Sequence, residues 1–287
     1  MEIQTLSTAA RPDRNEDLVT SFTHGDGTLD LLVFDGASSV SGHDYLDAAL
    51  GDPAWFVQQF SAALETVATP MTSQGDSMTL ALHALHERHH ALLVAAAMPC
   101  YAWPIAALSW LRVQANGIDA WLYALGDCKT FLLNAEGHVT DLDPYENPQE
   151  GLLKAAVEQL KHEGLDEQAR WARLLPMLRE RRVAQNMSMQ PSIVCMHPQG
   201  RFAAREHPVR LAGASSLLMM TDGFYRLVDH YHLHDDQSLM QTCTMHGLDV
   251  LMLQLRTHEA GETSAGMSVK KADDASVAML KPGLQHN

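Results

Sequence analysis

The chain alternates between short apolar runs and longer segments with helical spacing. The run from Leu31 to Phe34 is short and continuous, which is typical of a strand buried on both faces. Segment 54–68 places its bulky apolar side chains on one side of a helix, and Asp52 and Pro53 fit the N-cap and the first turn of that helix. A second helix is predicted from about 76 to 96.

A β-rich block follows these two helices. Its apolar runs lie at 105–113, 118–125 and 128–133, and Asn116-Gly117 separates the first two. Asn-Gly between apolar runs is a strong hairpin signal, so the block predicts antiparallel sheet, closed by a turn at Glu136-Gly137.

The C-terminal half contains more helix. Residues 150–183 are charged with a helical period, and Gly164 divides them into two predicted helices. A strand at 216–220, a helix at 237–258 and a last strand at 275–280 complete the prediction. Strands near both ends of the chain with helices between them favour one α+β domain spanning residues 1–287.

The net charge bears on which class of macromolecule the protein binds. The formal net charge is −15, from 35 acidic and 20 basic residues, which disfavours nucleic acid as a partner. The acidic excess permits a cluster of carboxylates around cations, although a solubilising surface charge explains it more simply.

The same sequence predicts a cytoplasmic protein with no membrane association. No apolar run reaches the roughly 18 residues that a membrane span needs, and the first residues lack the basic and apolar segments of a signal peptide. The four cysteines are far apart and form no CxxC pair, which favours reduced thiols.

Aspartates mark the edges of several predicted strands. Asp35-Gly36 ends one apolar run, Asp222 follows another, Asp273 precedes the last strand, and Asp127 lies in a glycine-containing turn. One such aspartate is usually a turn residue, but several like charges on one sheet need cations to be tolerated. Mg²⁺ and Mn²⁺ prefer oxygen ligands, and Asp-Gly offers a carboxylate and a carbonyl.

The acidic segments also come in a definite order: NED at 15–17, FDG at 34–36, LGD at 125–127, TDG at 221–223 and DDASV at 273–277. In this order they resemble the motifs of the metal-dependent protein phosphatases of type 2C, the PPM family, and most of all its divergent bacterial branch. The resemblance covers nearly the whole chain. It implies a four-layer α-β-β-α sandwich of two antiparallel sheets flanked by helices.

The resemblance implies two Mn²⁺ or Mg²⁺ ions, with a third as an option. Asp35 would bridge the two ions, the Gly36 carbonyl would bind one of them, and Asp222 and Asp273 would complete the shell of the first. These three aspartates would be the catalytic residues, because the ions they hold would activate the water that attacks phosphorus.

Further acidic residues have weaker implied roles. Glu16 and Asp17 would hold metal-bound waters, and Asp127 together with Asp222 matches the positions of a third metal. Asp274 stands where the family usually has asparagine, and a turn-stabilising role is favoured for it over ligation.

The implied substrate is a protein phosphorylated on serine or threonine. A phosphatase-fold regulatory module without catalysis and a small-molecule phosphatase are the alternatives, and the sequence does not indicate an oligomeric state. All three implied catalytic aspartates are present, which favours the enzyme.

Two positions depart from the family pattern. Pro12 occupies the position of the phosphate-binding arginine, with Arg11 and Arg14 on either side as candidates for that role. Ala37 replaces a histidine proposed as general acid in some members, and His43 is the nearby candidate to replace it.

Two histidine groups suggest a competing transition-metal site. They are His86, His89 and His90 at helical spacing, and His230, His232 and His234 in alternation. Neither group is joined in sequence by a full ligand set, so solvated or capping histidines are favoured over a zinc or nickel site.

Overall fold

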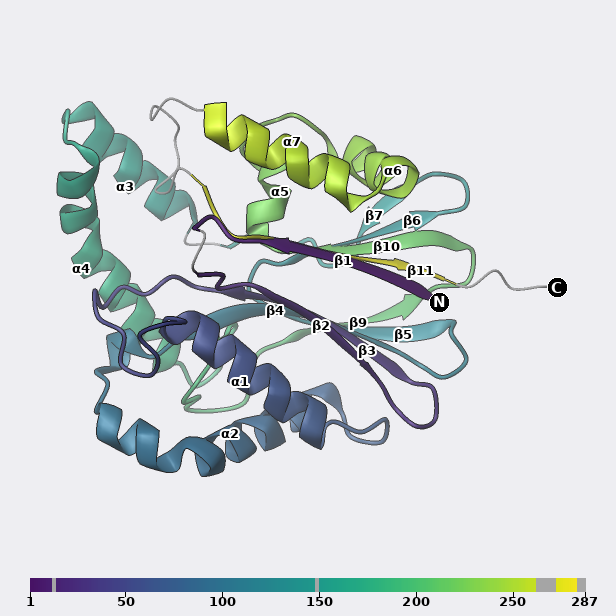
Figure 1. Ribbon diagram of the computed structural model, residues 1–287, viewed down its shortest axis with the longest axis horizontal. Coiled ribbons are helices and arrows are strands. Elements are labelled where there is room, and N and C mark those ends of the chain that lie inside the picture. Colours follow the sequence, from purple (N-terminus) through teal and green to yellow (C-terminus); the bar gives the residue numbers. More distant parts are fainter. Residues whose placement is uncertain (12–13, 148–149, 262–271, 283–287) are drawn as a thin grey trace.

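Two antiparallel sheets packed face to face form the centre of the computed structural model, which describes residues 1–11, 14–147, 150–261 and 272–282 (Figure 1). The first sheet has the strand order β1 (Glu2–Thr8), β11 (Ala275–Lys281), β10 (Ala214–Met220), β6 (Lys129–Asn134) and β7 (Val139–Asp141). The second has the order β2 (Leu18–Thr23), β3 (Leu29–Gly36), β4 (Ile105–Val113), β5 (Asp119–Leu125) and β9 (Arg205–Arg210), and β8 (Val194–Cys195) pairs with β4.

Helices cover both outer faces of this sandwich. The second sheet is covered by α1 (Asp52–Val67) and α2 (Gln74–Ala96), and the first by α5 (Asp222–Asp229), α6 (Asp236–His246) and α7 (Leu248–Gly261) (Figure 1). Two further helices, α3 (Glu150–His162) and α4 (Glu167–Asn186), lie at one end, at the left of Figure 1, and a short 3-10 helix, η1 (Cys100–Ala102), contacts α4. The predicted α-β-β-α architecture is confirmed.

Alternation along the strands produces the layers. In β3, Leu31 and Val33 belong to the core between the sheets, whereas Leu32 and Phe34 pack with α1 and α2. All four are fully buried, and burying each such side chain contributes about 1.5–3 kcal/mol. The continuous apolar run therefore corresponds to a strand that is covered on both faces, as predicted. Strand β3 extends through Asp35 and Gly36.

Two helix predictions were wrong in detail. Segment 237–258 is not one helix, because Gly247 has a φ of 88° and separates α6 from α7. The N-cap of α1 is Gly51 rather than Asp52. Asp52 is instead buried inside the first turn, where its carboxylate accepts hydrogen bonds from the backbone N–H groups of Tyr45 and Leu46 at 2.7–3.0 Å.

The first strand of the fold lies before the NED segment. Strand β2 follows this segment, whereas β1 precedes it and pairs along its whole length with β11. Its sequence EIQTLST has few bulky apolar residues, so its hydrophobic pattern is weak. The NED segment thus connects an edge strand of one sheet to an edge strand of the other.

A buried ion pair holds the middle of the second sheet. Asp30 of β3 accepts hydrogen bonds from Arg112 Nε at 2.8 Å, Arg112 Nη2 at 2.9 Å and Trp110 Nε1 at 2.6 Å. The Nη1 atom of Arg112 donates to the carbonyls of Thr69 and Thr72, next to α2. This arginine is buried. Its bonds to Asp30 join β4 to β3 within the second sheet, and its bonds to Thr69 and Thr72 join that sheet to the connection between α1 and α2.

None of the helices in the described ranges combines the length and the apolar character that crossing a membrane requires.

Candidate functional site

The predicted strand-edge aspartates line one cavity. Asp35 at the end of β3, Asp127 after β5, Asp222 at the start of α5 and Asp273 before β11 all line a cavity of about 210 Å³. Gly36 lines it too. Residues more than 200 positions apart in the chain therefore meet at one end of the sandwich, because each follows or precedes a strand whose end lies there.

Burial and mutual repulsion both disfavour the charged form of Asp35 at this cavity. Burial raises the pKa of Asp35 well above its usual value, and the negative charges of Asp222, Asp17, Asp127 and Asp273 raise it further. Such a group of carboxylates is stable only with protons or cations among them. Because the donors are oxygen atoms, the set fits hard divalent cations such as Mg²⁺ and Mn²⁺.

The carboxylates surround the cavity without forming a closed cage. Within the described ranges, no three His, Cys, Asp or Glu side chains take the close arrangement of a completed metal site. Asp222 is exposed and Asp35 is half-buried. The cavity is therefore open to solvent on one side.

Glu16 and Asp17 lie behind the cavity wall rather than on it. The Glu16 carbonyl accepts a hydrogen bond from the Gly36 N–H at 3.1 Å, and the Ser38 hydroxyl donates to the Glu16 carboxylate. Asp17 accepts a hydrogen bond from Thr221 Oγ1 at 2.8 Å. Burial raises the pKa of Asp17, a shift that the Thr221 hydrogen bond partly offsets. Both residues are therefore attached to the segments that carry Asp35 and Asp222.

The glycines of FDG and TDG are required by close backbone approach. A Cβ at Gly36 would lie 2.4 Å from the Glu16 carbonyl oxygen, and one at Gly223 would lie 1.8 Å from the Asp274 carbonyl oxygen. Real Cβ atoms do not approach so closely. Each glycine thus permits two of the acidic segments to touch.

Asp274 has a structural role, as favoured from the sequence. Its Oδ1 accepts a hydrogen bond from the Ala10 N–H at 2.7 Å, and its Oδ2 accepts one from the Glu16 N–H at 2.6 Å. The carboxylate spans two loops instead of stabilising only its own turn. It thereby fixes the NED segment beside the last strand.

The candidate phosphate-binding arginines from the sequence do not line the cavity. Arg14 donates to Asp44 Oδ2 and to the Ala48 carbonyl, both at 2.8 Å, and Arg11 is exposed and pairs with Arg14 through the backbone. The cavity wall contains Arg181 and Arg182 of α4 instead.

Sequence reasoning missed these two arginines. The sequence feature that could have indicated them is the run Arg179-Glu180-Arg181-Arg182, which lies in a predicted helix. Nothing in the sequence indicated which loop that helix would cover. In the structure, Arg179 donates to the carbonyls of Val40 and Ser41, and Arg182 donates to the Ser38 carbonyl at 3.1 Å. Helix α4 is therefore attached to the loop that follows Asp35.

Arg182 is a buried cation facing the carboxylates. Burial lowers its pKa to about 10, and Glu16 opposes that shift. A guanidinium remains charged at neutral pH even so. The cavity thus has carboxylates on its strand-end side and guanidinium groups on its α4 side.

The candidate general acid does not reach the cavity. His43 packs edge-on against the Tyr45 ring at 4.6 Å, and His43 is not among the residues that line the cavity. Ala37 lies on the cavity wall, and its N–H donates to the Ile105 carbonyl.

The histidine groups have other partners. His86 bonds the Met196 carbonyl, His89 bonds Gln59, His232 bonds the Val228 carbonyl and His234 bonds Gln254. These partners lie in different parts of the fold. The transition-metal hypothesis therefore gains no support from the described residues.

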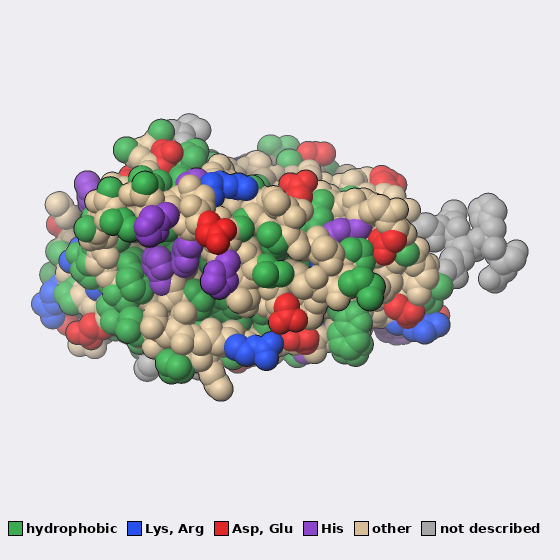
Figure 2. Space-filling view, turned by 90° about the horizontal axis from the view of Figure 1, so that it is seen from below, with side chains coloured by type: hydrophobic (Ala, Val, Ile, Leu, Met, Phe, Trp, Pro, Cys, Tyr) green, Lys and Arg blue, Asp and Glu red, His purple; other side chains and the backbone are tan. Residues whose placement is uncertain are grey.

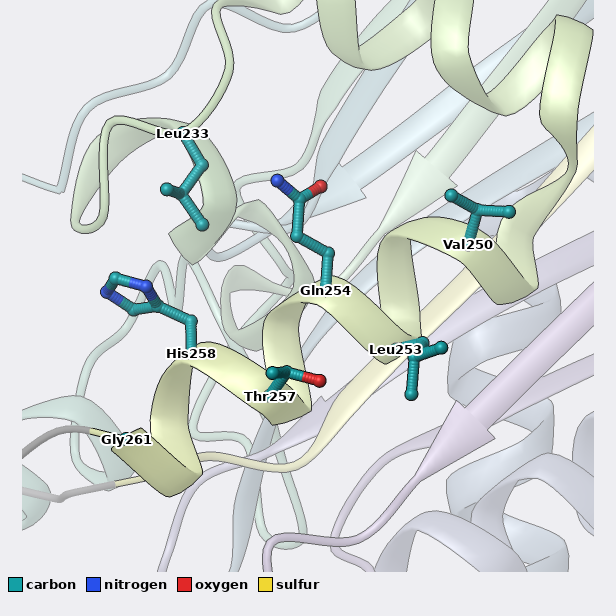
Figure 3. Close-up of a pocket in the computed structure, with 7 residues that line it drawn as sticks. All are labelled: Leu233, Val250, Leu253, Gln254, Thr257, His258 and Gly261. Atoms are coloured by element: carbon teal, nitrogen blue, oxygen red, sulfur yellow. The ribbon is translucent and has the colours of Figure 1, made fainter.

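Two other hollows lack this chemistry. One lies along α7, has a volume of about 680 Å³ and is lined mainly by apolar side chains such as Val250 and Leu253 (Figure 3). The other, about 790 Å³, lies beside α2, on the face where Figure 2 shows histidines gathering. Its wall includes His86 stacked on His197, and burial lowers the pKa of His197 to about 4, so that ring is neutral.

The fold is similar to those of solved bacterial phosphatases. A structure described as a bacterial serine phosphatase matches with a TM-score of 0.57 and 14% identity, covering 100% of both chains. The serine/threonine phosphatase from Staphylococcus aureus matches with a TM-score of 0.57 and 14% identity, over 98% of this chain and 94% of that one. PppA, described as a key regulatory component of T6SS in Pseudomonas aeruginosa, matches with a TM-score of 0.53 and 14% identity, over 97% and 96%.

At this identity the likeness establishes the fold. No family model matches the chain, and neither does any curated protein.

The contact between Gly223 and Asp274 yields a stability prediction. Gly223→Ala must displace the Asp274 backbone, and overpacking of this kind costs about 1–3 kcal/mol or more. Gly25→Ala is the matched control, because nothing lies within 4 Å of the added methyl group. Urea unfolding measures both variants. Equal midpoints for the two would contradict the close approach.

Proposed function

We propose that this protein is a metal-dependent phosphomonoester hydrolase that acts on phosphoserine or phosphothreonine in proteins, with two Mn²⁺ or Mg²⁺ ions. The observation that carries the proposal is the cavity itself, in which four aspartates face two arginines. Carboxylates alone would indicate a cation site, and arginines alone an anion site. A phosphoester bound to divalent cations needs both. The fold shared with serine/threonine phosphatases supports the same reaction class.

The aspartates would hold the cations. Asp35 would be the ligand shared by two ions, the Gly36 carbonyl would bind one of them, and Asp222 and Asp273 would complete the shell; all four residues line the cavity. When bound, two such ions would lower the pKa of a bound water and neutralise phosphoryl oxygens. Asp35, Asp222 and Asp273 would thereby orient the attacking oxygen relative to the substrate.

The remaining acidic residues would support this core. Glu16 and Asp17 would orient metal-bound water through their carboxylates, and Thr221 donates a hydrogen bond to Asp17. Asp127 accepts a hydrogen bond from Asn147 Nδ2 at 3.2 Å and lines the cavity next to it, which suits a weaker, third cation site.

Arg182 and Arg181 would bind the phosphoryl group. A guanidinium matches two phosphate oxygens, and a buried one binds more strongly than a solvated one. Arg182 has one hydrogen bond to the described residues, so its other N–H groups remain for an anion in the cavity. This assignment replaces Arg11 and Arg14 with residues that already face the aspartates.

The cavity volume bears on the substrate. About 210 Å³ is below the roughly 300–1,000 Å³ typical of pockets that enclose a small-molecule ligand. Such a space suits a phosphoryl group with its ions, while the rest of the substrate stays outside. That arrangement favours a phosphorylated protein over a small phosphoester.

The decisive assay is Mn²⁺-dependent phosphate release from phosphothreonine peptides. Wild-type protein should turn over in Mn²⁺ and lose activity in a chelator. Asp35→Asn keeps the side-chain shape but removes the bridging charge, so it should lower activity by at least about tenfold. Asp119→Asn, on an exposed strand residue, is the control and should retain activity.

Two outcomes would redirect the proposal. Phosphopeptide binding without turnover in wild-type protein would support the regulatory module. Retention of most activity by Asp35→Asn would remove the bridging role from that residue.

A second prediction tests which arginine binds the phosphoryl group. Arg182→Lys removes the fork that binds two oxygens, and a charged hydrogen bond is worth about 1.5–3 kcal/mol, so the KM for phosphopeptide should rise by about 10- to 100-fold. Inorganic phosphate should inhibit the variant correspondingly less. Arg14→Lys should change both quantities less than about twofold. If Arg14→Lys changed KM and phosphate inhibition more than Arg182→Lys did, phosphate binding would be assigned to Arg14 instead.

A further inference from the structure

A buried ion cluster on α7 lies behind two of the four cavity aspartates. Its centre is Glu259, which is 4% exposed. Glu259 Oε2 accepts a hydrogen bond from Arg256 Nη1 at 2.5 Å, and Glu259 Oε1 lies 4.0 Å from Arg226 Nη1. One carboxylate therefore lies between two guanidinium groups that belong to different helices.

Arg256 connects α7 to the segment that carries Asp273. Its Nη1 donates to the Asp273 carbonyl at 2.8 Å. Its Nε and Nη2 donate to Thr8 Oγ1 at 3.0 and 2.8 Å, and Nη2 also donates to the Thr8 carbonyl at 2.8 Å. Thr8 ends β1 and pairs with Ala275 of β11, two residues after Asp273. The planar fork of one guanidinium makes all these bonds at once, which an ammonium group cannot do.

Arg226 connects the same cluster to Asp222. Both residues belong to α5, which begins at Asp222, and Arg226 lies four residues later, one turn along the same face. Arg226 is 7% exposed and lies over the Tyr231 ring at 5.2 Å. Because α5 has eight residues, an anchor at Arg226 constrains its first residue.

We propose that Arg256 and Glu259 are positioning residues that fix the spacing between Asp222 and Asp273 at the candidate metal centre. The inference rests on the proposed function. Asp222 and Asp273 line one cavity, where the negative charge of each raises the pKa of Asp35; one lies at the start of a short helix and the other in the segment before β11. The cluster on α7 holds the backbone of one and the helix of the other. Partners of this kind typically affect metal affinity by 10- to 100-fold.

Arg256→Lys tests the proposal by keeping the charge and removing the fork. Isothermal titration with Mn²⁺ should show affinity reduced by about 10- to 100-fold. At saturating Mn²⁺, kcat should return to within about threefold of wild type and the KM for substrate should stay unchanged, because Arg256 does not line the cavity. A role in stability alone would leave the Mn²⁺ affinity of the folded protein unchanged, so affinities are compared under conditions in which the variant is folded before Mn²⁺ is added.

Arg112→Lys is the matched control. The Arg112 side chain makes four hydrogen bonds, against five for Arg256, and is even less exposed, but it lies in the second sheet and contacts Asp30. This variant should lose stability while its folded fraction binds Mn²⁺ as wild type does. Equal losses of Mn²⁺ affinity in Arg112→Lys and Arg256→Lys would overturn the positioning role.

Glu259→Gln provides a second variant, in case Arg256→Lys does not fold. It keeps the side-chain size but leaves two arginines without their shared counter-charge, so Mn²⁺ affinity should again fall by at least tenfold. Unchanged affinity in a folded Glu259→Gln or Arg256→Lys variant would refute the inference. Wild-type protein that binds no Mn²⁺ would instead refute the proposed function, so the two failures are distinguishable.

Discussion

Repulsion between carboxylates is the constraint on which the arrangement of this site depends. The fold brings Asp17, Asp127, Asp222 and Asp273 close enough to Asp35 that each raises its pKa, which burial has already raised. The contacts of the surrounding structure hold these carboxylates together in spite of their like charges.

Those contacts are mostly made by the backbone at sheet edges. The NED segment lies in the connection from β1 of one sheet to β2 of the other, and Asp274 accepts hydrogen bonds from the Ala10 and Glu16 N–H groups of this connection. Gly36 and Gly223 let neighbouring segments touch at distances that a side chain would prevent. On the far side, α4 contributes Arg182 and, through Arg179, binds the loop after Asp35. Two sheets and one end helix therefore meet at a single cavity.

Much of this could be predicted from sequence, because the informative features are local. The apolar run before Asp35, the Asn116-Gly117 hairpin and the order of the acidic motifs each lie within a few residues, and they predicted the sandwich correctly. Helix α7 was merged with α6, since one glycine in an otherwise helical pattern carries little weight. Arg182 and Glu259 were missed because their roles depend on which distant loop their helices cover. That the chain forms one domain over 1–287 stays a prediction.

The central claim is that the four aspartates lining the cavity hold two hard cations. The most direct measurement is a crystal structure of the protein grown with Mn²⁺, with anomalous difference maps recorded near the manganese edge. We predict two peaks about 3.5–4 Å apart, both within bonding distance of Asp35. Absence of density at Asp35, or peaks only at histidines such as His86 and His197 beside α2, would contradict it.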